Sequence, residues 1–444
     1  MLSKDHRLKQ IQLSPPRILA LSFFIVMIIG TLLLKLPIST NVSISWLDAL
    51  FTAVSSTTVT GLIVVDTGTV FTTFGQIVIM GLIQIGGLGL MTFAVLIFII
   101  LGKKIGLKER ILIQEALNQA SLGGIIRLVK ILFAFTIIIE LIAAIILAIR
   151  WVPEYGVAHG LFISAFHAVS AFNNAGFSTF TDNLMGYVGD PIVNIVITLL
   201  FITGGIGFTV LIDVWKKRRF HDFALHTKLM LVGTLTINVI AMLFIFALEY
   251  ANPSTLAPLS MGDKLWAAYF QGVTPRTAGF NSLDIGSLTD GSIVLMLLLM
   301  FIGAGSASTG SGIKLSTFIV ILFAVGSFLR GRTDTVIFER TIKPSTIMRS
   351  LAIVVTSLFA VFLTIFILAI TEDESFVMLV FEAFSAFGTV GISMGVTPEL
   401  SPIGKIVIMC LMFLGRVGPL TLAFSLARAQ QSNIRYPDEE ILTG

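Results

Sequence analysis

Long apolar runs, separated by short polar segments, recur along the whole chain. The clearest runs cover residues 19–36, 131–149, 192–214, 229–248, 294–328, 351–370 and 403–426. Each is near or above the ~20 residues that an α-helix needs to cross a bilayer. Composition agrees, because only 12% of the 444 residues are charged, whereas a typical soluble domain has about 25%. The pattern predicts an all-α polytopic membrane protein.

Basic residues gather on one side of a simple alternating topology. Twenty-two of the 29 Lys and Arg residues fall in the N-terminal segment, after the second span, in "WKKRRFHDFALHTK", in residues 330–349 and near the C-terminus. The positive-inside rule makes these segments and both termini cytoplasmic, in a multi-pass protein of the cell membrane. A basic cluster such as residues 216–219 could instead bind nucleic acid, but a topology signal explains it better, so we expect no nucleic-acid partner.

Acidic residues gather on the opposite side, where negative charge around an outer opening would concentrate cations. They are Asp48, Asp66, Glu154, Asp182, Asp190, Asp263, Asp284, Asp290, Glu372, Asp373 and Glu374.

A short polar motif with one glycine occurs four times. The stretch "TTVTGL" has the relatives "FNNAGF", "PRTAGF" and "FGTVGI", which align Gly61, Gly176, Gly279 and Gly391. A second motif follows each glycine by 24 to 28 residues, and it begins at Gly86, Gly204, Gly303 and Gly415. The joint spacing indicates four copies of one unit.

Each unit consists of a span, a half-buried segment of about a dozen residues, a polar glycine loop and a second span. Two crossings per unit make the four repeats parallel, so the fold predicted is four tandem repeats with eight transmembrane and four re-entrant helices around a pseudo-fourfold pore. We place the repeats at residues 18–110, 111–219, 220–332 and 333–428, between a basic cytoplasmic tail (1–17) and a C-terminal cytoplasmic tail (429–444).

Non-helical backbone at membrane depth is tolerated only where it lines a water-filled path or is buried in protein. Four such loops around one axis can direct carbonyls at a dehydrated monovalent cation, and glycine permits the backbone conformation required. The alternative is that the glycines are close-packing points between helices. That alternative suits "GGLG" and "GGIG" better than the four loops, which carry Thr and Asn.

The fourfold unit with a single glycine per loop resembles the Trk/Ktr/HKT superfamily of potassium transporters, and most of all the membrane subunit of Ktr systems. The resemblance extends from about residue 15 to about residue 428. It implies potassium uptake, often dependent on sodium, by a homodimer that rests on a cytosolic ring of nucleotide-binding, RCK-type regulatory subunits. Potassium, with sodium as a second ion, is therefore the ion expected, and no covalent cofactor is expected.

The resemblance also assigns a selectivity filter of four tripeptides. They are Val59, Thr60 and Gly61; Asn174, Ala175 and Gly176; Thr277, Ala278 and Gly279; and Thr389, Val390 and Gly391. The T-V-G-Y-G sequence of tetrameric potassium channels is absent and the four loops differ from one another. We therefore expect fewer ion sites and moderate discrimination of potassium from sodium.

The second span of the third repeat is interrupted by small and polar residues that favour unwinding. The interruption consists of Gly303, Ala304, Gly305, Ser306, Ala307, Ser308, Thr309, Gly310, Ser311 and Gly312. The resemblance makes it an intramembrane gating loop, which Lys314 could hold through a hydrogen bond. A phosphate-binding loop is rejected because Ser311 stands where that motif requires Lys. A kinked, closely packed helix remains the alternative.

Two arginines lie within apolar surroundings. Arg416, in the last span, should face the ion path, because intramembrane arginines need a partner or a water-filled cavity and few acids lie at that depth. Facing the path, it would oppose cations as the gate arginine of the family does. Arg276 is expected to brace the third loop from behind, with Glu382 as its candidate partner.

Other functions fit less well. An enzyme is not expected, because catalytic motifs and paired intramembrane carboxylates are lacking. A secondary carrier for a small solute would need inverted repeats and clustered ionisable residues. A less selective monovalent cation channel is closer in architecture, and the sequence does not separate a gated channel from a coupled transporter.

Overall fold

The computed structural model describes residues 15–89, 125–418, 437 and 439. Most of the two tails that are predicted to be cytoplasmic, and the expected boundary between the first two repeats at residue 110, lie outside these described residues. Within the described residues the chain is mostly helical and has several apolar spans, which confirms the all-α polytopic class.

Four long helices carry many of the exposed large apolar side chains. They are α1 (Pro15–Leu34), α7 (Ile125–Tyr155), α11 (Leu225–Glu249) and α15 (Pro344–Thr371). Within the described ranges, these are the four unbent helices that are long and apolar enough to cross a membrane. Each belongs to a different expected repeat and precedes a short helix.

The short helices end at the four glycine loops. They are α2 (Trp46–Thr58), α8 (Val157–Phe172), α12 (Met261–Val273) and α16 (Phe376–Gly388), with 13 to 16 residues each. Ser45 and Ser260 cap the first turns of α2 and α12 by accepting amides at Asp48 and Asp263. This length is too short to span a bilayer, in agreement with re-entrant segments.

The second helix of each repeat is short, with 12 to 16 residues. These helices are α4 (Thr73–Leu88), α9 (Pro191–Ile206), α13 (Asp290–Phe301) and α17 (Pro402–Val417). Three of them end before a glycine with positive φ, namely Gly89 at 84°, Gly207 at 106° and Gly418 at 91°. A left-handed glycine ends a helix readily, because it has no Cβ to clash.

The run at 192–214 is therefore not one straight helix, whereas the predicted interruption within the run at 294–328 is present. At Gly207 the chain turns by 94° into α10 (Phe208–Lys217). The other run is broken between α13 and α14 (Leu315–Leu329). After α14 a small antiparallel hairpin, β1 (Val336–Ile337) and β2 (Arg340–Thr341), leads to α15, and the apolar pattern did not predict it.

Short connecting turns complete the described elements. They are α3 (Thr67–Val70), η1 (Met185–Tyr187), η2 (Phe220–Asp222), η3 (Ile285–Ser287) and η4 (Thr397–Glu399).

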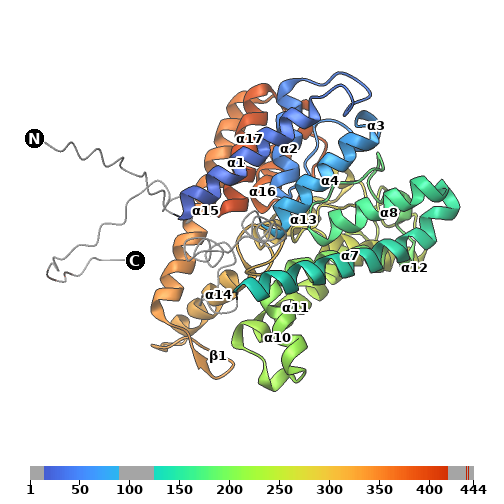
Figure 1. Cartoon of the computed structure of the whole chain (residues 1–444). Helices are drawn as coiled ribbons and strands as arrows, with labels where there is room; N and C mark the ends of the chain where they lie inside the picture. Colours follow the sequence, from blue (N-terminus) through green and yellow to red (C-terminus); the bar gives the residue numbers. More distant parts are fainter. Residues whose placement is uncertain (1–14, 90–124, 419–436, 438, 440–444) are drawn as a thin grey trace, which may run out of the picture.

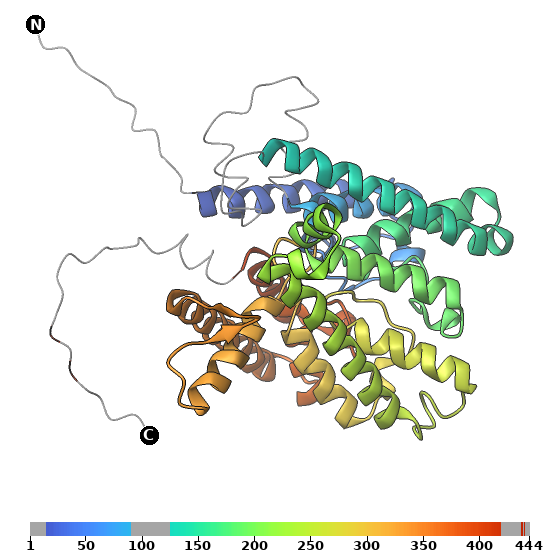
Figure 2. The ribbon, with the colours of Figure 1, turned by 90° about the horizontal axis from the view of Figure 1, so that it is seen from below.

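Contacts between helices close into a ring. The second helix of each repeat contacts the short helix of the next: α4 contacts α8, α9 contacts α12, α13 contacts α16, and α17 contacts α2. The last contact brings red α17 beside blue α2 (Figure 1). From below, the colours follow one another around the molecule in sequence order (Figure 2). The arrangement is consistent with four tandem repeats around one axis.

A backbone contact joins the second helix to the short helix within a repeat. A Cβ added at Gly86, Gly204 or Gly415 would lie 2.0, 1.9 or 2.0 Å from the carbonyl oxygen of residue 57, 172 or 387. Each of these carbonyls stands four residues before a loop glycine. In these three repeats the second glycine motif therefore provides close-packing points, as expected for "GGLG" and "GGIG". This packing fixes the position of each glycine loop along its second helix.

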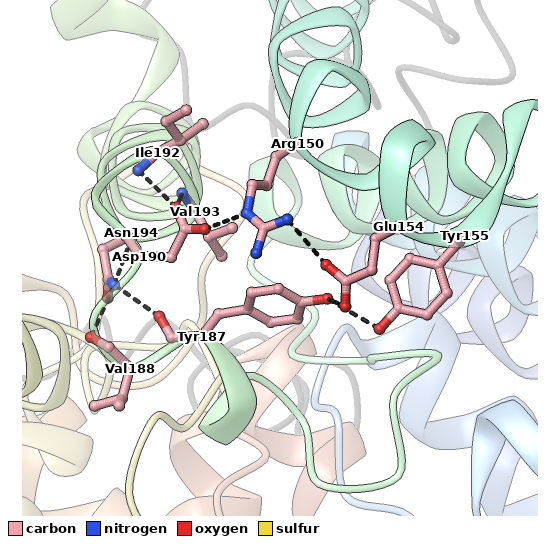
Figure 3. A network of polar contacts seen from close by, with 9 residues as sticks. All are labelled: Arg150, Glu154, Tyr155, Tyr187, Val188, Asp190, Ile192, Val193 and Asn194. Atoms are coloured by element: carbon pink, nitrogen blue, oxygen red, sulfur yellow. Dashed lines mark hydrogen bonds and ion pairs between the residues drawn. The ribbon is translucent and has the colours of Figure 1, made fainter.

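A polar network ties α7 to α9 on the face that carries the acidic residues (Figure 3). Arg150 Nε lies 2.5 Å from Asp190 Oδ2, and Arg150 Nη1 lies 2.9 Å from Glu154 Oε2. Asp190 also caps α9 by accepting two backbone amides. Burial raises the pKa of Tyr187, and the neighbouring Tyr155 and Glu154 raise it further, so its hydroxyl stays protonated and donates to Glu154 Oε1 at 3.2 Å.

Gly86→Ala should destabilise the protein, because its Cβ would overlap the carbonyl oxygen of Thr57, 2.0 Å away. Overpacking of this kind costs about 1–3 kcal/mol. The matched control is Gly81→Ala in the same helix, where nothing lies within 4 Å of the added Cβ. Thermal unfolding of the purified protein in detergent should show a lower midpoint for Gly86→Ala alone. Equal midpoints for the two variants would contradict the close-packing account.

Candidate functional site

The four glycine loops meet one another in sequence order. A Cβ on Gly61 would lie 2.4 Å from Ala175 O, and one on Gly176 would lie 3.1 Å from Ala278 O. The ring continues with Gly279 and Val390 O at 2.2 Å, and it closes with Gly391 and Thr60 O at 2.1 Å. The structure thus brings the four predicted tripeptides together, and the glycine of each loop lies directly against a carbonyl of the next loop.

The four loops share one backbone conformation although their sequences differ. The residue two positions before each glycine is left-handed: Val59 at 58°, Asn174 at 59°, Thr277 at 69° and Thr389 at 46°. The glycines have φ values of 95°, 67°, 80° and 90°. Three of the left-handed residues are β-branched, for which this conformation is a genuine outlier. Strain of this kind persists only where the surroundings impose it, and it concentrates at functional sites.

Four buried hydroxyls hold the loops from the short-helix side. Ser55 Oγ accepts the amide of Gly61 at 3.1 Å, and Ser385 Oγ accepts that of Gly391 at 3.1 Å. Ser170 Oγ donates to Phe177 O at 2.7 Å, and Thr274 Oγ1 donates to Phe280 O at 2.5 Å. Sequence reasoning missed these residues. The signal was available, because three of the hydroxyls stand six positions before the glycine and the fourth stands five before.

The electrostatics of the ring favour a positive charge. Each short helix ends at a loop, so its C-terminal carbonyls and the negative end of its dipole face the ring. Among the described residues, no group of three His, Cys, Asp or Glu side chains could hold a metal ion.

The predicted intramembrane loop packs against two of these glycine loops. Residues 302–314, between α13 and α14, are not helical. Thr309 Oγ1 donates to Asn174 Oδ1 at 2.7 Å, and Asn174 Nδ2 donates to Thr277 Oγ1 at 3.3 Å. A Cβ on Gly310 would lie 2.4 Å from Thr277 Oγ1. The loop thus touches the second and third tripeptides directly.

Further contacts fix the rest of this loop. Gly305 N donates to Gly205 O at 2.7 Å, and Phe208 N donates to Ala307 O at 2.8 Å. Lys314 Nζ donates to Gly310 O at 2.8 Å, so the predicted hydrogen bond from Lys314 to this loop is present. Ser306, Ala307 and Ser308 are half-buried, whereas most of the loop is buried.

The guanidinium of Arg416 joins the loop to the end of α4. Its Nη1 donates to Thr309 O and, at 3.2 Å, to Ser311 Oγ, while its Nη2 donates to Gly86 O and, at 3.1 Å, to Gly87 O. The terminal carbonyls of α4 are natural partners for a cation, because they lack helical donors and carry the negative end of the dipole. No ion pair to Arg416 occurs in the described part of the chain.

The expected pairing of Arg276 with Glu382 is wrong. Arg276 Nη1 donates to Asn238 Oδ1 at 3.0 Å, and its Nε is buried without a partner beside a pocket of about 20 Å³. Glu382 instead accepts from Ser393 Oγ at 2.7 Å and from Thr397 Oγ1. Two hydroxyls of its own repeat satisfy the Glu382 carboxylate, so it has no need of a distant guanidinium.

Comparisons with known proteins cover nearly the whole chain. The family model for TrkH, described as cation transport protein, matches residues 2–436. The chain is 68% identical over 443 residues to the Ktr system potassium uptake protein B of Bacillus subtilis (strain 168), with 100% of both chains covered. It is 38% identical over 442 residues to the potassium/sodium uptake protein NtpJ of Enterococcus hirae, with 98% of both covered.

A solved structure shares the fold. The crystal structure of the potassium transporter TrkH from Vibrio parahaemolyticus matches with a TM-score of 0.74 at 20% sequence identity, covering 96% of this chain and 87% of that one. At this identity the likeness concerns the fold alone.

Proposed function

The chain belongs to the TrkH family of cation transport proteins, and we propose on that premise that it takes up potassium ions as the ion-translocating subunit of a Ktr-type system. Its family transports cations, so it is not an enzyme. The observation that carries the proposal is the closed ring of four loops, in which carbonyls meet glycines at the convergence of four helix C-termini.

The ring acts as the selectivity filter. The carbonyl oxygens of the two residues before each glycine replace the hydration shell of the ion, and the helix dipoles lower the cost of its charge. These residues are Val59 and Thr60, Asn174 and Ala175, Thr277 and Ala278, and Thr389 and Val390. Each loop has only one glycine, so few of its carbonyls can turn toward the ion and few ion sites can form. Discrimination against sodium should therefore be moderate.

The gate consists of residues 303–312 with Lys314 and Arg416. The loop lies against the filter loops and Arg416 fastens it to α4, so conduction requires this fastening to open. The guanidinium adds a positive charge near the path, which opposes cations where water is scarce. This role follows from the four hydrogen bonds of Arg416 and from its lack of a carboxylate partner among the described residues.

The cellular setting follows from the charge pattern and from the relatives. Twenty-two basic residues on one side of the proposed topology support a cytoplasmic location for both termini. The word "system" in a relative's name supports further subunits, for which we propose a homodimer resting on a cytosolic RCK-type nucleotide-binding ring. Sodium is the candidate second ion. A less selective monovalent cation pathway remains the competing function, favoured by the relative from E. hirae that is named for potassium and sodium.

Gly279→Ser should relax discrimination, since Gly279 has φ 80° and its Cβ would lie 2.2 Å from Val390 O. Rubidium uptake into vesicles with competing sodium measures the effect, and we expect a loss of about tenfold, equivalent to about 1.4 kcal/mol. Gly326→Ser is the control, because nothing lies within 4 Å of that Cβ. Unchanged selectivity in Gly279→Ser at normal abundance would remove the filter assignment.

Arg416→Ser should increase rubidium uptake severalfold, because it removes both the fastening and the charge. Arg416→Lys separates these effects, since Lys retains the charge but lacks the planar fork that reaches two elements. An intermediate rate for Lys is expected, and Arg330→Ser on the exposed surface should match the parent. If Arg416→Ser conducts no faster than the parent at equal surface abundance, Arg416 is not part of the gate.

A further inference from the structure

A buried carboxylate lies close to the turn of α4 that Arg416 holds. Glu140, in the middle of α7, is 8% exposed. Its Oε1 accepts from Asn173 Nδ2 at 3.0 Å, and its Oε2 accepts from Gln84 Nε2 at 3.3 Å. Asn173 Nδ2 also donates to Gln84 Oε1 at 2.9 Å. We call Gln84, Glu140 and Asn173 the carboxylate cluster. It joins α4, α7 and the end of α8.

Packing alone does not account for this carboxylate. No ion pair to Glu140 occurs among the described residues, and an acidic side chain inside a membrane span is costly without such a partner. A leucine of similar volume would avoid that cost. The carboxylate is nevertheless suited to its two neighbours, because it is an acceptor at both oxygens and both neighbours donate to it.

The cluster leads directly to the second filter loop. Asn173 is the C-cap of α8, and the next residue, Asn174, takes up the left-handed conformation of the loop at φ 59°. The Asn174 side chain then accepts from Thr309 and donates to Thr277. Asn174, the residue directly after the cluster residue Asn173, therefore contacts both the gating loop and the third filter loop.

The cluster also leads to the fastening point of Arg416. Gln84 is two residues before Gly86, whose carbonyl accepts from Arg416 together with that of Gly87. A Cβ on Gly87 would lie 2.1 Å from Asn173 Oδ1, so the side chain of Asn173 packs directly against this turn of α4. A change in the orientation of Asn173 would shift the turn of α4 and the second loop together.

Helix α7 is a fixed support for this arrangement. Its far end is tied to α9 through Arg150 and Asp190 at 2.5 Å (Figure 3). Ten residues separate Arg150 from Glu140, or roughly 15 Å of helix. An anchor at that distance limits sliding of α7, so Glu140 presents its two oxygens at a set height.

We propose that Glu140 is a positioning residue for the second filter loop. It holds the side chain of Asn173, and through Asn173 it sets the left-handed turn at Asn174 and hence how tightly the filter holds an ion. This inference rests on the proposed function, because it takes the ring of loops to be the ion site.

Rubidium uptake into vesicles tests the proposal with Glu140→Ala, Glu140→Gln and Glu140→Asp, each normalised to surface abundance. Glu140→Ala should raise the apparent KM for rubidium about tenfold and make sodium a stronger competitor, with the maximal rate changed less than twofold. Glu140→Gln should raise KM by less, because its amide retains one acceptor but places a donor against a donor. Glu140→Asp keeps two acceptors and should lie nearest the parent.

Glu249→Ala is the matched control. Glu249 is likewise a buried carboxylate without an ion pair among the described residues, although it lies at the end of α11, and its partners Asn252, Thr255, Thr289 and Ser292 lie outside the four filter loops. It should lower abundance and leave KM unchanged. The proposal is overturned if all three Glu140 variants keep the parental KM and sodium competition, or if Glu249→Ala raises KM equally.

Rubidium uptake by the parent protein distinguishes failure of the proposed function from failure of the role of Glu140. A parent protein without rubidium uptake rejects the proposed function and with it the role of Glu140. A parent with uptake and Glu140 variants of parental KM rejects only the role of Glu140. Glu140→Asp and Glu140→Gln keep the test available should the alanine variant not reach the membrane.

Discussion

The contact between a glycine and its neighbour's carbonyl is the constraint on which the rest of the structure depends. Four loops can meet on one axis only if each admits the backbone of the next, and the carbonyls of Thr60, Ala175, Ala278 and Val390 occupy the places that side chains would take. Any Cβ there would push the loops apart. Polar backbone of this kind is acceptable at membrane depth where it lines a path or is buried in protein.

The ring is held by layers of contacts that lie progressively further from the axis. Hydroxyls such as Ser55 and Ser385 fix the strained loops to their short helices. The second helices then press glycines against the ends of the short helices, as Gly415 does at the carbonyl of Phe387. Arg416 connects the broken helix of the third repeat to the end of α4. The proposed filter and the proposed gate therefore share one set of backbone contacts.

The features that could be predicted from the sequence are mainly those that recur in the four repeats. Repetition located the four glycine loops, the family resemblance assigned their tripeptides, and composition located the break in the third repeat. The hydrogen-bond partner of a buried side chain was less predictable. Arg276 reaches Asn238 rather than Glu382, because the direction of its side chain depends on three-dimensional packing that a single sequence does not contain. The cluster around Glu140 joins residues 33 and 56 positions apart, and it has no counterpart in the other repeats that could have revealed it. The bend at Gly207 was hidden because apolar residues continue on both sides of it.

The central claim is that a bare monovalent cation sits among these carbonyls. Anomalous diffraction from crystals grown in thallium or rubidium tests it most directly, because these ions replace potassium and scatter strongly. The account predicts a peak on the axis between the four glycines, within coordination distance of the carbonyl oxygens of Thr60, Ala175, Ala278 and Val390. Peaks confined to other parts of the molecule, with none on this axis, would contradict it.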